Sequence, residues 1–375
     1  MAEKIEIPFL RPQLLPIGSY LDDFERIIDS GLITNGGPYE QELNEKAATF
    51  LSGGVRCVAV SNCTIGLMLA LKALTHGHER GKKVLLPSFT FAATALAVEW
   101  CNLEAVFADI DPDRWALDLS EEQRERIKSR ASEFAAFLVV NPFGAPADVG
   151  PWEDLAQEVG VPLVIDSAAG FGSYYEDGSR LGTRGTCEVF SLHATKTFAV
   201  GEGGLIATRD AELATTLNSM KNFGFDGETK SRLPGLNGKL AEMFCAMAVR
   251  TLERLDTIIE RRRAIAAAYR ERLEPRCFKF QKHGGLSTYP FVPVLVPKDR
   301  RRDEVLDRAR ARGVSLRRYY SPLHRHPQFA GLARLGPLTV TESVADEILS
   351  LPTRNDFSTA EIDLVSRVIS GSPGA

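Results

Sequence analysis

The chain of 375 residues has no apolar run that approaches the ~20 residues needed to span a bilayer. Its start, MAEKIEIPFL, carries acidic residues and lacks the apolar core of an export signal, so we expect a cytoplasmic protein. None of the six cysteines forms a CxxC pair, which disfavours a zinc site and a disulfide framework. The net charge of −4 argues against a nucleic-acid-binding protein, because such proteins concentrate Lys and Arg.

Common nucleotide-binding and metal-binding motifs are also missing. No GxGxxG follows a predicted strand, which argues against a nicotinamide dehydrogenase. The pair Gly81-Lys82 is not a P-loop, because His76 stands where that motif has its first glycine. His324 and His326 by themselves supply too few ligands for a metal ion, so we expect no metal.

Short β-branched runs alternate with helical patterns between residue 55 and about residue 208. This alternation predicts an α/β fold with a largely parallel sheet that helices cover on both faces. We expect strands within residues 55–62, 82–89, 103–110, 134–144, 161–169, 186–192 and 203–210. Helical patterns lie between several of them, as in residues 64–77 and 151–160.

The C-terminal part has a different character. Residues 240–273 show one long helical pattern, in which the apolar side chains of Phe244, Ala248, Leu252, Leu255 and Ile259 follow one stripe. Extended runs and helices from about residues 303 and 359 come after it, and they predict a smaller α+β domain. We therefore predict a large domain over residues 1–250 and a small domain over residues 251–375, packed together because no linker separates them.

Three segments at predicted strand ends carry candidate chemistry. In SNCTIGL, residues 61–67, a strand leads into a helix that Asn62 or Thr64 can cap, and such a helix start binds phosphate. Asp166 ends the apolar strand of VPLVIDSAAG. In FSLHATKTFAVGEGG, Lys196 lies five residues after Ser191, before glycines that allow a sharp return into the next strand.

Taken singly, these segments are also explained by a capping turn, an N-cap and a solvated lysine. Pyridoxal 5′-phosphate (PLP) requires all three together. It needs a cup for its phosphate, an acid beside its ring nitrogen and a lysine amine that bonds to its aldehyde. Its ring also needs a flat apolar cover, and Phe89 or Phe91 in PSFTFAAT can supply one.

At these residues the sequence resembles the DegT/StrS family of PLP-dependent nucleotide-sugar aminotransferases, which are fold-type I enzymes of the aspartate aminotransferase superfamily. The resemblance covers nearly the whole chain. It includes GLITNGGPYEQEL, PSFTFAATALAV, FSLHATKTFAVGEGG, VSLRRYYSPLH and ILSLPTRNDFS. It implies a large PLP-binding domain and a smaller C-terminal domain.

The resemblance assigns roles to individual residues. Lys196 matches the lysine that forms the Schiff base, and Asp166 matches the acid that pairs with the pyridine nitrogen. Phe91 matches the aromatic residue that covers the ring. The phosphate ligands match Ser191, Cys63, Thr64 and, from the second subunit, Asn222. That last match implies a homodimer with shared active sites. Thr34, His193, Tyr319, Tyr320 and His324 are candidate contacts for the substrate.

Two positions depart from the family pattern. Cys63 stands where the family usually has glycine, but a backbone amide at that position does not require glycine. At Ala169 the family has a polar side chain that touches the ring hydroxyl of the cofactor, and this contact is missing here. The tuning of the ring is therefore put in question.

The resemblance implies transfer of an amino group, with glutamate as the donor, to a keto-sugar nucleotide. Within the family we favour a dTDP-linked 4-keto-6-deoxyhexose in bacterial deoxyamino-sugar synthesis. A 3-keto sugar nucleotide, a cyclitol ketone and a non-catalytic regulatory role are alternatives. Sugar dehydratases of the same family carry histidine at the lysine position, so Lys196 argues against that reaction.

Overall fold

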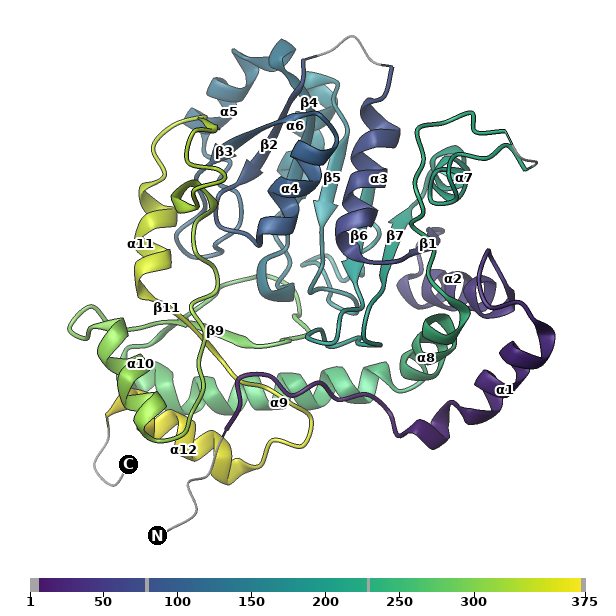
Figure 1. The fold of residues 1–375 in the computed structure, drawn as a ribbon. Coiled ribbons are helices and arrows are strands. Elements are labelled where there is room, and N and C mark those ends of the chain that lie inside the picture. The colour runs from purple at the N-terminus through teal and green to yellow at the C-terminus, as the bar shows by residue number, and fades with distance from the viewer. Residues whose placement is uncertain (1–6, 78–80, 228–229, 372–375) are drawn as a thin grey trace.

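The computed structural model describes residues 7–77, 81–227 and 230–371, and a sheet of eight strands lies at its centre (Figure 1). The strand order is β1-β7-β6-β5-β4-β2-β3-β10. Strand β7 runs antiparallel to both of its neighbours, and every other pair is parallel. The bounds are β1 Arg56–Val60, β2 Lys83–Pro87, β3 Glu104–Ala108, β4 Phe134–Val140, β5 Leu163–Asp166, β6 Cys187–Ser191, β7 Gly204–Thr208 and β10 Ala333–Arg334.

Helices cover both faces of this sheet, and each face has its own apolar core. One face packs against α3 (Cys63–Thr75), α4 (Ala92–Trp100) and α7 (Ala211–Met220). The other packs against α2 (Pro38–Leu51), α5 (Glu121–Lys128), α6 (Gly150–Val159) and α8 (Glu242–Leu252). Because both faces are buried, strands such as β4 are apolar throughout and do not alternate. The predicted α/β fold class and all seven predicted strands are confirmed.

A smaller α+β unit packs below the large sheet as it is drawn in Figure 1. Its antiparallel sheet has the order β11-β9-β8, with β8 at Lys279–Phe280, β9 at Val292–Leu295 and β11 at Ile348–Leu351. Helices α10 (Arg302–Ala311) and α12 (Thr359–Ser370) pack on it. The other helices are α1 (Leu21–Ser30) and α11 (Thr339–Glu347), with 3-10 turns at Ile17–Ser19, Ala131–Glu133, Pro142–Gly144, Glu274–Arg276 and Leu323–Arg325.

The prediction of a single long helix over residues 240–273 is wrong in one respect, because the structure has two helices there. Helix α8 ends at Leu252, and α9 (Leu255–Leu273) begins after a break of two residues. The expected apolar stripe is buried on α8 and α9 apart from Phe244, which is 36% exposed. Because the break lies between two apolar turns, the periodicity continues across it and the sequence pattern does not reveal it.

Helix α9 runs along the bottom of Figure 1 and joins the two parts of the molecule. Leu255 and Ile259 near its start belong to the core of the large sheet, and Tyr269 near its end belongs to the core of the small sheet. Strand β10, beyond residue 251, adds to the large sheet, whereas Ile7 pairs with Val314 in the small part. The division at residue 250 stays a prediction. None of the described helices is long and apolar enough to cross a membrane.

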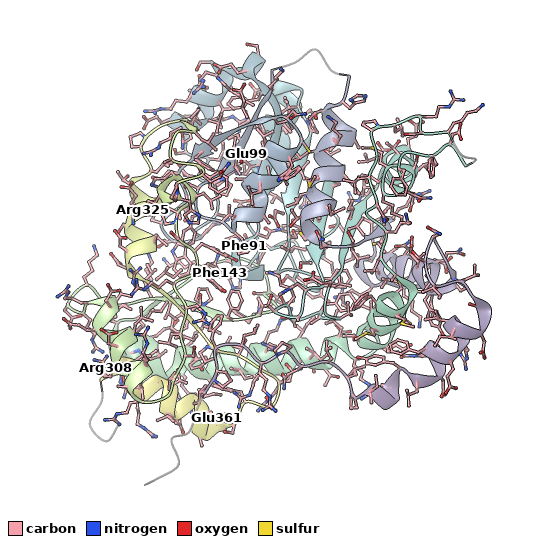
Figure 2. All side chains as sticks on the ribbon, viewed as in Figure 1. Phe91, Glu99, Phe143, Arg308, Arg325 and Glu361 are labelled. Carbon is pink, nitrogen blue, oxygen red and sulfur yellow. The ribbon has the colours of Figure 1, made fainter. Side chains whose placement is uncertain are left out.

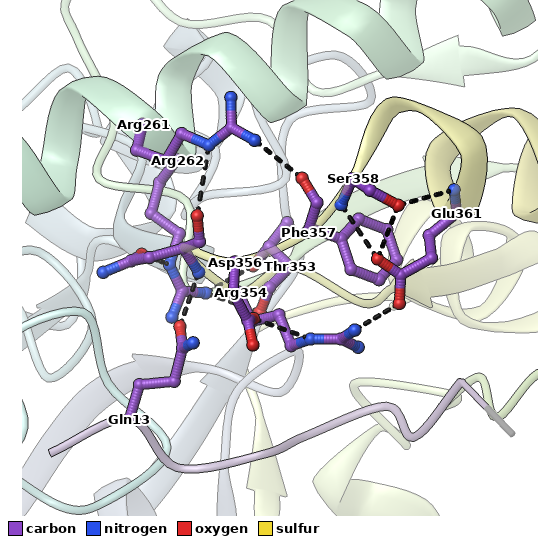
Figure 3. Close-up of polar contacts among 10 residues, drawn as sticks. Gln13, Arg261, Arg262, Thr353, Arg354, Asp356, Phe357, Ser358 and Glu361 are labelled. Atoms are coloured by element: carbon purple, nitrogen blue, oxygen red, sulfur yellow. Dashed lines mark hydrogen bonds and ion pairs between the residues drawn. The ribbon is translucent and has the colours of Figure 1, made fainter.

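A buried arginine on α9 forms hydrogen bonds with the turn that precedes α12 (Figure 3). The guanidinium of Arg262 donates hydrogen bonds to the Thr353 carbonyl and hydroxyl, each at 2.7 Å, and to the Asn355 side chain at 2.8 Å. Burial lowers the pKa of Arg262 to about 10. Arg262 forms no ion pair with a carboxylate among the described residues, so neutral oxygen acceptors stabilise its positive charge.

We expect Arg262→Met to lower the free energy of unfolding by roughly 2–4 kcal/mol, because it leaves several buried acceptors without donors. The matched control is Arg261→Met, since Arg261 is exposed and bonds the carbonyls of Asn355 and Phe357 at the surface. This control costs less than about 1 kcal/mol. Denaturant unfolding of the two variants measures the difference, and equal losses would contradict the assignment.

Candidate active site

A cavity of 630 Å³ opens where β4, β5 and β6 end at the carboxyl edge of the large sheet. Parallel α/β sheets place their ligand sites at this edge. The small part of the chain closes the cavity with Phe291, Arg317, Tyr319 and Tyr320. Nine residues singled out in the sequence line it together, namely Cys63, Thr64, Phe91, Asp166, Ser191, His193, Lys196, Tyr319 and Tyr320.

Asp166 is the last residue of β5 and is 5% exposed. Its carboxylate accepts hydrogen bonds from the Thr94 hydroxyl at 2.8 Å and from the Ala168 amide at 3.1 Å. Burial raises the pKa of Asp166, while these two donors and the charge of Lys196 oppose that increase. The carboxylate forms no ion pair with any residue that the structure describes.

Lys196 lies in the loop between β6 and β7, half-buried in the wall of the cavity. The loop is held by hydrogen bonds from the Lys196 amide to the His193 carbonyl at 2.9 Å and from the Ala194 amide to the Gly201 carbonyl at 2.8 Å. Desolvation lowers the pKa of Lys196, and the electrostatic interactions with Cys63 and Asp166 partly oppose this. A larger share of neutral amine makes Lys196 a better nucleophile.

The start of α3 and the end of β6 meet where we expect the phosphate cup. Asn62 caps α3, since its side chain accepts from the Ile65 amide at 2.9 Å. The amides of Cys63 and Thr64 have no acceptor within the helix, and both residues line the cavity together with Ser191. Gly204 begins β7 against this turn, and a Cβ atom there would lie 2.8 Å from the Cys63 nitrogen. Only glycine permits that approach.

The two phenylalanines of PSFTFAAT have different positions. Phe89 is fully buried in an aromatic cluster with Phe143 and Tyr320. Phe91 precedes α4, is 60% exposed and lines the cavity, so it is the one available to cover a ring. Figure 2 labels Phe91 and Phe143 at the lower end of α4, near the carboxyl edge of the sheet.

The residues present fit PLP. A buried carboxylate without a counterion is costly, and a protonated pyridine nitrogen is the partner that would compensate Asp166. A lysine with a lowered pKa and a helix start with free amides share the same cavity. These groups match the aldehyde, the neighbouring phosphate arm and the ring nitrogen opposite the aldehyde in one small ring.

Sequence reasoning missed Thr94, whose hydroxyl bonds Asp166 and also lies 2.9 Å from the Thr90 hydroxyl. Thr94 is on the inner side of α4, and nothing in its local sequence distinguishes it from a helix threonine. Glu202 was also missed; it lines the cavity and lies 3.6 Å from the His193 ring.

Three predicted residues do not line the cavity within one chain. Thr34 lies in an exposed turn, and the Asn222 side chain accepts a hydrogen bond from Lys239 at 2.9 Å. His324 is buried between Ser88 and Glu342, at 2.7 and 3.1 Å. Their roles toward cofactor or substrate stay predictions.

Without PLP, Asp166→Asn should raise the free energy of unfolding at pH 7 by roughly 1 kcal/mol, because it removes a buried charge that has no partner. Folding raises the pKa of Asp166, so the charged carboxylate lowers the free energy of unfolding of the wild type at pH values above that pKa. The wild type regains this stability as the pH falls through the raised pKa. The gain should therefore vanish near pH 4. Denaturant unfolding of the cofactor-free proteins at both pH values measures it, and a loss of stability at pH 7 would contradict it.

Comparison with known proteins now adds a second line of evidence. The model of the DegT/DnrJ/EryC1/StrS aminotransferase family matches residues 18–370. Protein Rv3402c of Mycobacterium tuberculosis is 35% identical over 371 residues, covering 97% of this chain and 89% of that protein. The dTDP-4-amino-4,6-dideoxy-D-glucose transaminase of Escherichia coli is 29% identical over 376 residues, covering 97% and 98%.

Solved structures agree. A Bacillus cereus chain assigned as a PLP-dependent aminotransferase has a TM-score of 0.92 and 31% identity, covering 97% of this chain and 100% of that one. DesI, solved in the presence of its TDP-sugar product, has a TM-score of 0.89 and 34% identity, covering 98% and 93%. The cavity built around Lys196 and Asp166 and the family match over nearly the whole chain lead to one conclusion: this protein belongs to the DegT/DnrJ/EryC1/StrS aminotransferase family and is a PLP-dependent aminotransferase.

Proposed function

We propose that this enzyme transfers an amino group from glutamate to a dTDP-linked 4-keto-6-deoxyhexose, as a step in bacterial deoxyamino-sugar synthesis. The observation that carries the proposal is the single cavity that holds both Lys196 and Asp166. The choice of sugar is supported by the Escherichia coli relative, named for dTDP-4-amino-4,6-dideoxy-D-glucose, and by DesI with its TDP-sugar product.

PLP, when bound, supplies an electron sink that makes a proton on the carbon beside the bound amine acidic. Lys196 would hold the cofactor through its amine until the amino donor displaced it. The freed amine, whose pKa is lowered by burial, would then move a proton between Cα of the donor and C4′ of the cofactor. Backbone hydrogen bonds hold the loop that carries this lysine at the cavity wall.

Asp166 keeps the ring nitrogen protonated, and Thr94 fixes the carboxylate in the orientation that faces the cavity. The amides of Cys63 and Thr64, with Ser191, hold the phosphate, and Phe91 covers the ring. These residues would hold the cofactor on three sides, and residues of the small part line the same cavity. Tyr319 and His193 line the remaining space, where the sugar would bind.

The proposed enzyme is a homodimer in which Asn222 reaches the phosphate of the partner's site. The support is a set of exposed apolar side chains, those of Ile17, Leu32, Ile33, Phe223 and Phe244. Phe244 lies against the Lys196 loop, since its ring would be 3.4 Å from a Cβ on Gly201. Ile33 is joined to the start of α8 through its carbonyl. A second copy would cover this surface and complete the site.

We expect Lys196→Ala to abolish the visible absorbance of the purified enzyme with PLP and to lower the turnover rate by at least about a thousandfold. Lys196→Arg is the matched control, because it keeps the positive charge but cannot bond to the aldehyde, and it should behave in the same way. A coloured, active Lys196→Ala variant would sink the role of this lysine.

The substrate is tested with glutamate and a panel of ketones, with product detected by mass. We expect amination of the dTDP-linked 4-keto-6-deoxyhexose at a kcat/KM at least about tenfold above that of a 3-keto isomer, a UDP-linked analogue and a cyclitol ketone. A preference for one of those three would replace the proposed substrate and leave the aminotransferase assignment intact.

Mixing two inactive variants tests the shared site. Lys196→Ala and Asn222→Ala subunits, unfolded and refolded together, should regain activity that neither has alone. In the mixed dimer one site has an intact Lys196 and receives an intact Asn222 from its partner. If Asn222 acted within its own chain, both sites would be defective and no activity would return.

A further inference from the structure

The departure at Ala169 leaves one polar atom of the cofactor without its usual contact, and the structure indicates which residue replaces it. In PLP the ring hydroxyl and the phosphate arm are attached on opposite sides of the line from the ring nitrogen to the aldehyde carbon. Asp166 on β5 fixes the nitrogen, and Lys196 fixes the aldehyde. The phosphate lies on the β6 side with Ser191, so the hydroxyl lies on the β4 side.

Four residues of the cavity lining belong to the β4 side. Asn141 and Pro142 directly follow β4, Ala169 lies against Gly144 of the same turn, and Tyr320 stacks on Phe143 of that turn. Asn141 is fully committed within the protein. Its amide nitrogen donates to the Ser167 hydroxyl at 2.8 Å and to the Tyr175 hydroxyl at 3.4 Å, and its oxygen accepts from the Ala147 amide at 2.7 Å. The side chains of Pro142 and Ala169 have no donor.

Tyr320 is held against this wall by its ring. It stacks on Phe143 with a centroid distance of 4.9 Å and meets the edge of Phe89 at 5.8 Å. Its hydroxyl forms no hydrogen bond with any residue in the described part of the chain. Burial raises the pKa of Tyr320, and the negative charge of Asp166 adds to this, so the hydroxyl stays protonated and can donate.

We propose that the Tyr320 hydroxyl donates a hydrogen bond to the 3-oxygen of PLP and so takes the place of the side chain missing at Ala169. Because contacts with two phenylalanines already fix the ring of Tyr320, its hydroxyl can form this hydrogen bond with little loss of conformational entropy. The role rests on the PLP cofactor and is independent of the proposed sugar.

The proposal is tested by the pH at which the visible absorbance of the bound cofactor changes. Negative charge on the 3-oxygen retains the proton on the nitrogen that joins Lys196 to the cofactor. A hydrogen bond donated to that oxygen disperses the charge and releases this proton at lower pH. Tyr320→Phe keeps the stacked ring and should raise the pKa of that nitrogen by about one unit, a tenfold change in proton affinity.

Two further variants make the result specific. Tyr319→Phe, which alters the neighbouring ring of the same cavity, should leave the transition where it is in the wild type. Ala169→Gln combined with Tyr320→Phe returns a donor at the family's usual position and should restore the lower pKa. The other titratable residues that line the cavity, Cys63, Asp166, His193, Lys196, Glu202 and Arg317, are the same in every variant.

No shift in Tyr320→Phe, or an equal shift in Tyr319→Phe, would overturn the proposal. A shift that Ala169→Gln leaves unchanged would also overturn it, because the effect would then come from a general change in the polarity of the cavity.

Discussion

The site depends on one buried charge, the carboxylate of Asp166. It lies at the end of β5, in the middle of a sheet that is covered on both faces, where water cannot stabilise it. Thr94 and the Ala168 amide compensate it in part, and burial still raises its pKa. A cation in the cavity would compensate it fully, and the ring nitrogen of PLP is the cation that we propose. Binding of the cofactor would then offset the unfavourable burial of this charge.

The other cofactor contacts are arranged around that carboxylate by the order of the strands. Because β5 lies between β4 and β6, the residues that follow these strands approach the cofactor from its two sides. Ser191 and the start of α3 come from one side, and the aromatic wall of Phe143 and Tyr320 comes from the other. The wall belongs partly to the small unit, which α9 and the buried Arg262 tie to the rest. Packing around α9 therefore helps to position the residues that line the cavity at the edge of the sheet.

The sequence predicted the sheet well because its strands are short, apolar and separated by helical patterns, and such strands are recognisable one by one. It singled out Asp166 and Ser191 because each ends such a strand, and Lys196 because it lies between two of them before a glycine turn, and all three line one cavity. It could not find the break between α8 and α9, since the apolar period continues through it. Local pattern could not separate Phe89 from Phe91, because both follow β2; the family resemblance favoured Phe91, and the packing shows that Phe89 is the enclosed one. Thr94 was invisible, since its partner is 72 positions away.

By itself, the sequence determined the class of the fold, the family resemblance and the set of groups that a PLP enzyme requires. These are properties of local pattern and of residue type at strand ends. The tertiary structure alone decided which groups meet. It placed Tyr320 in the cavity that Ala169 also lines, left Asp166 without an ion-pair partner among the described residues and put His324 outside the cavity. The physical reason is that burial, charge pairing and hydrogen-bond satisfaction depend on neighbours that are distant in the chain, and local periodicity carries no information about them.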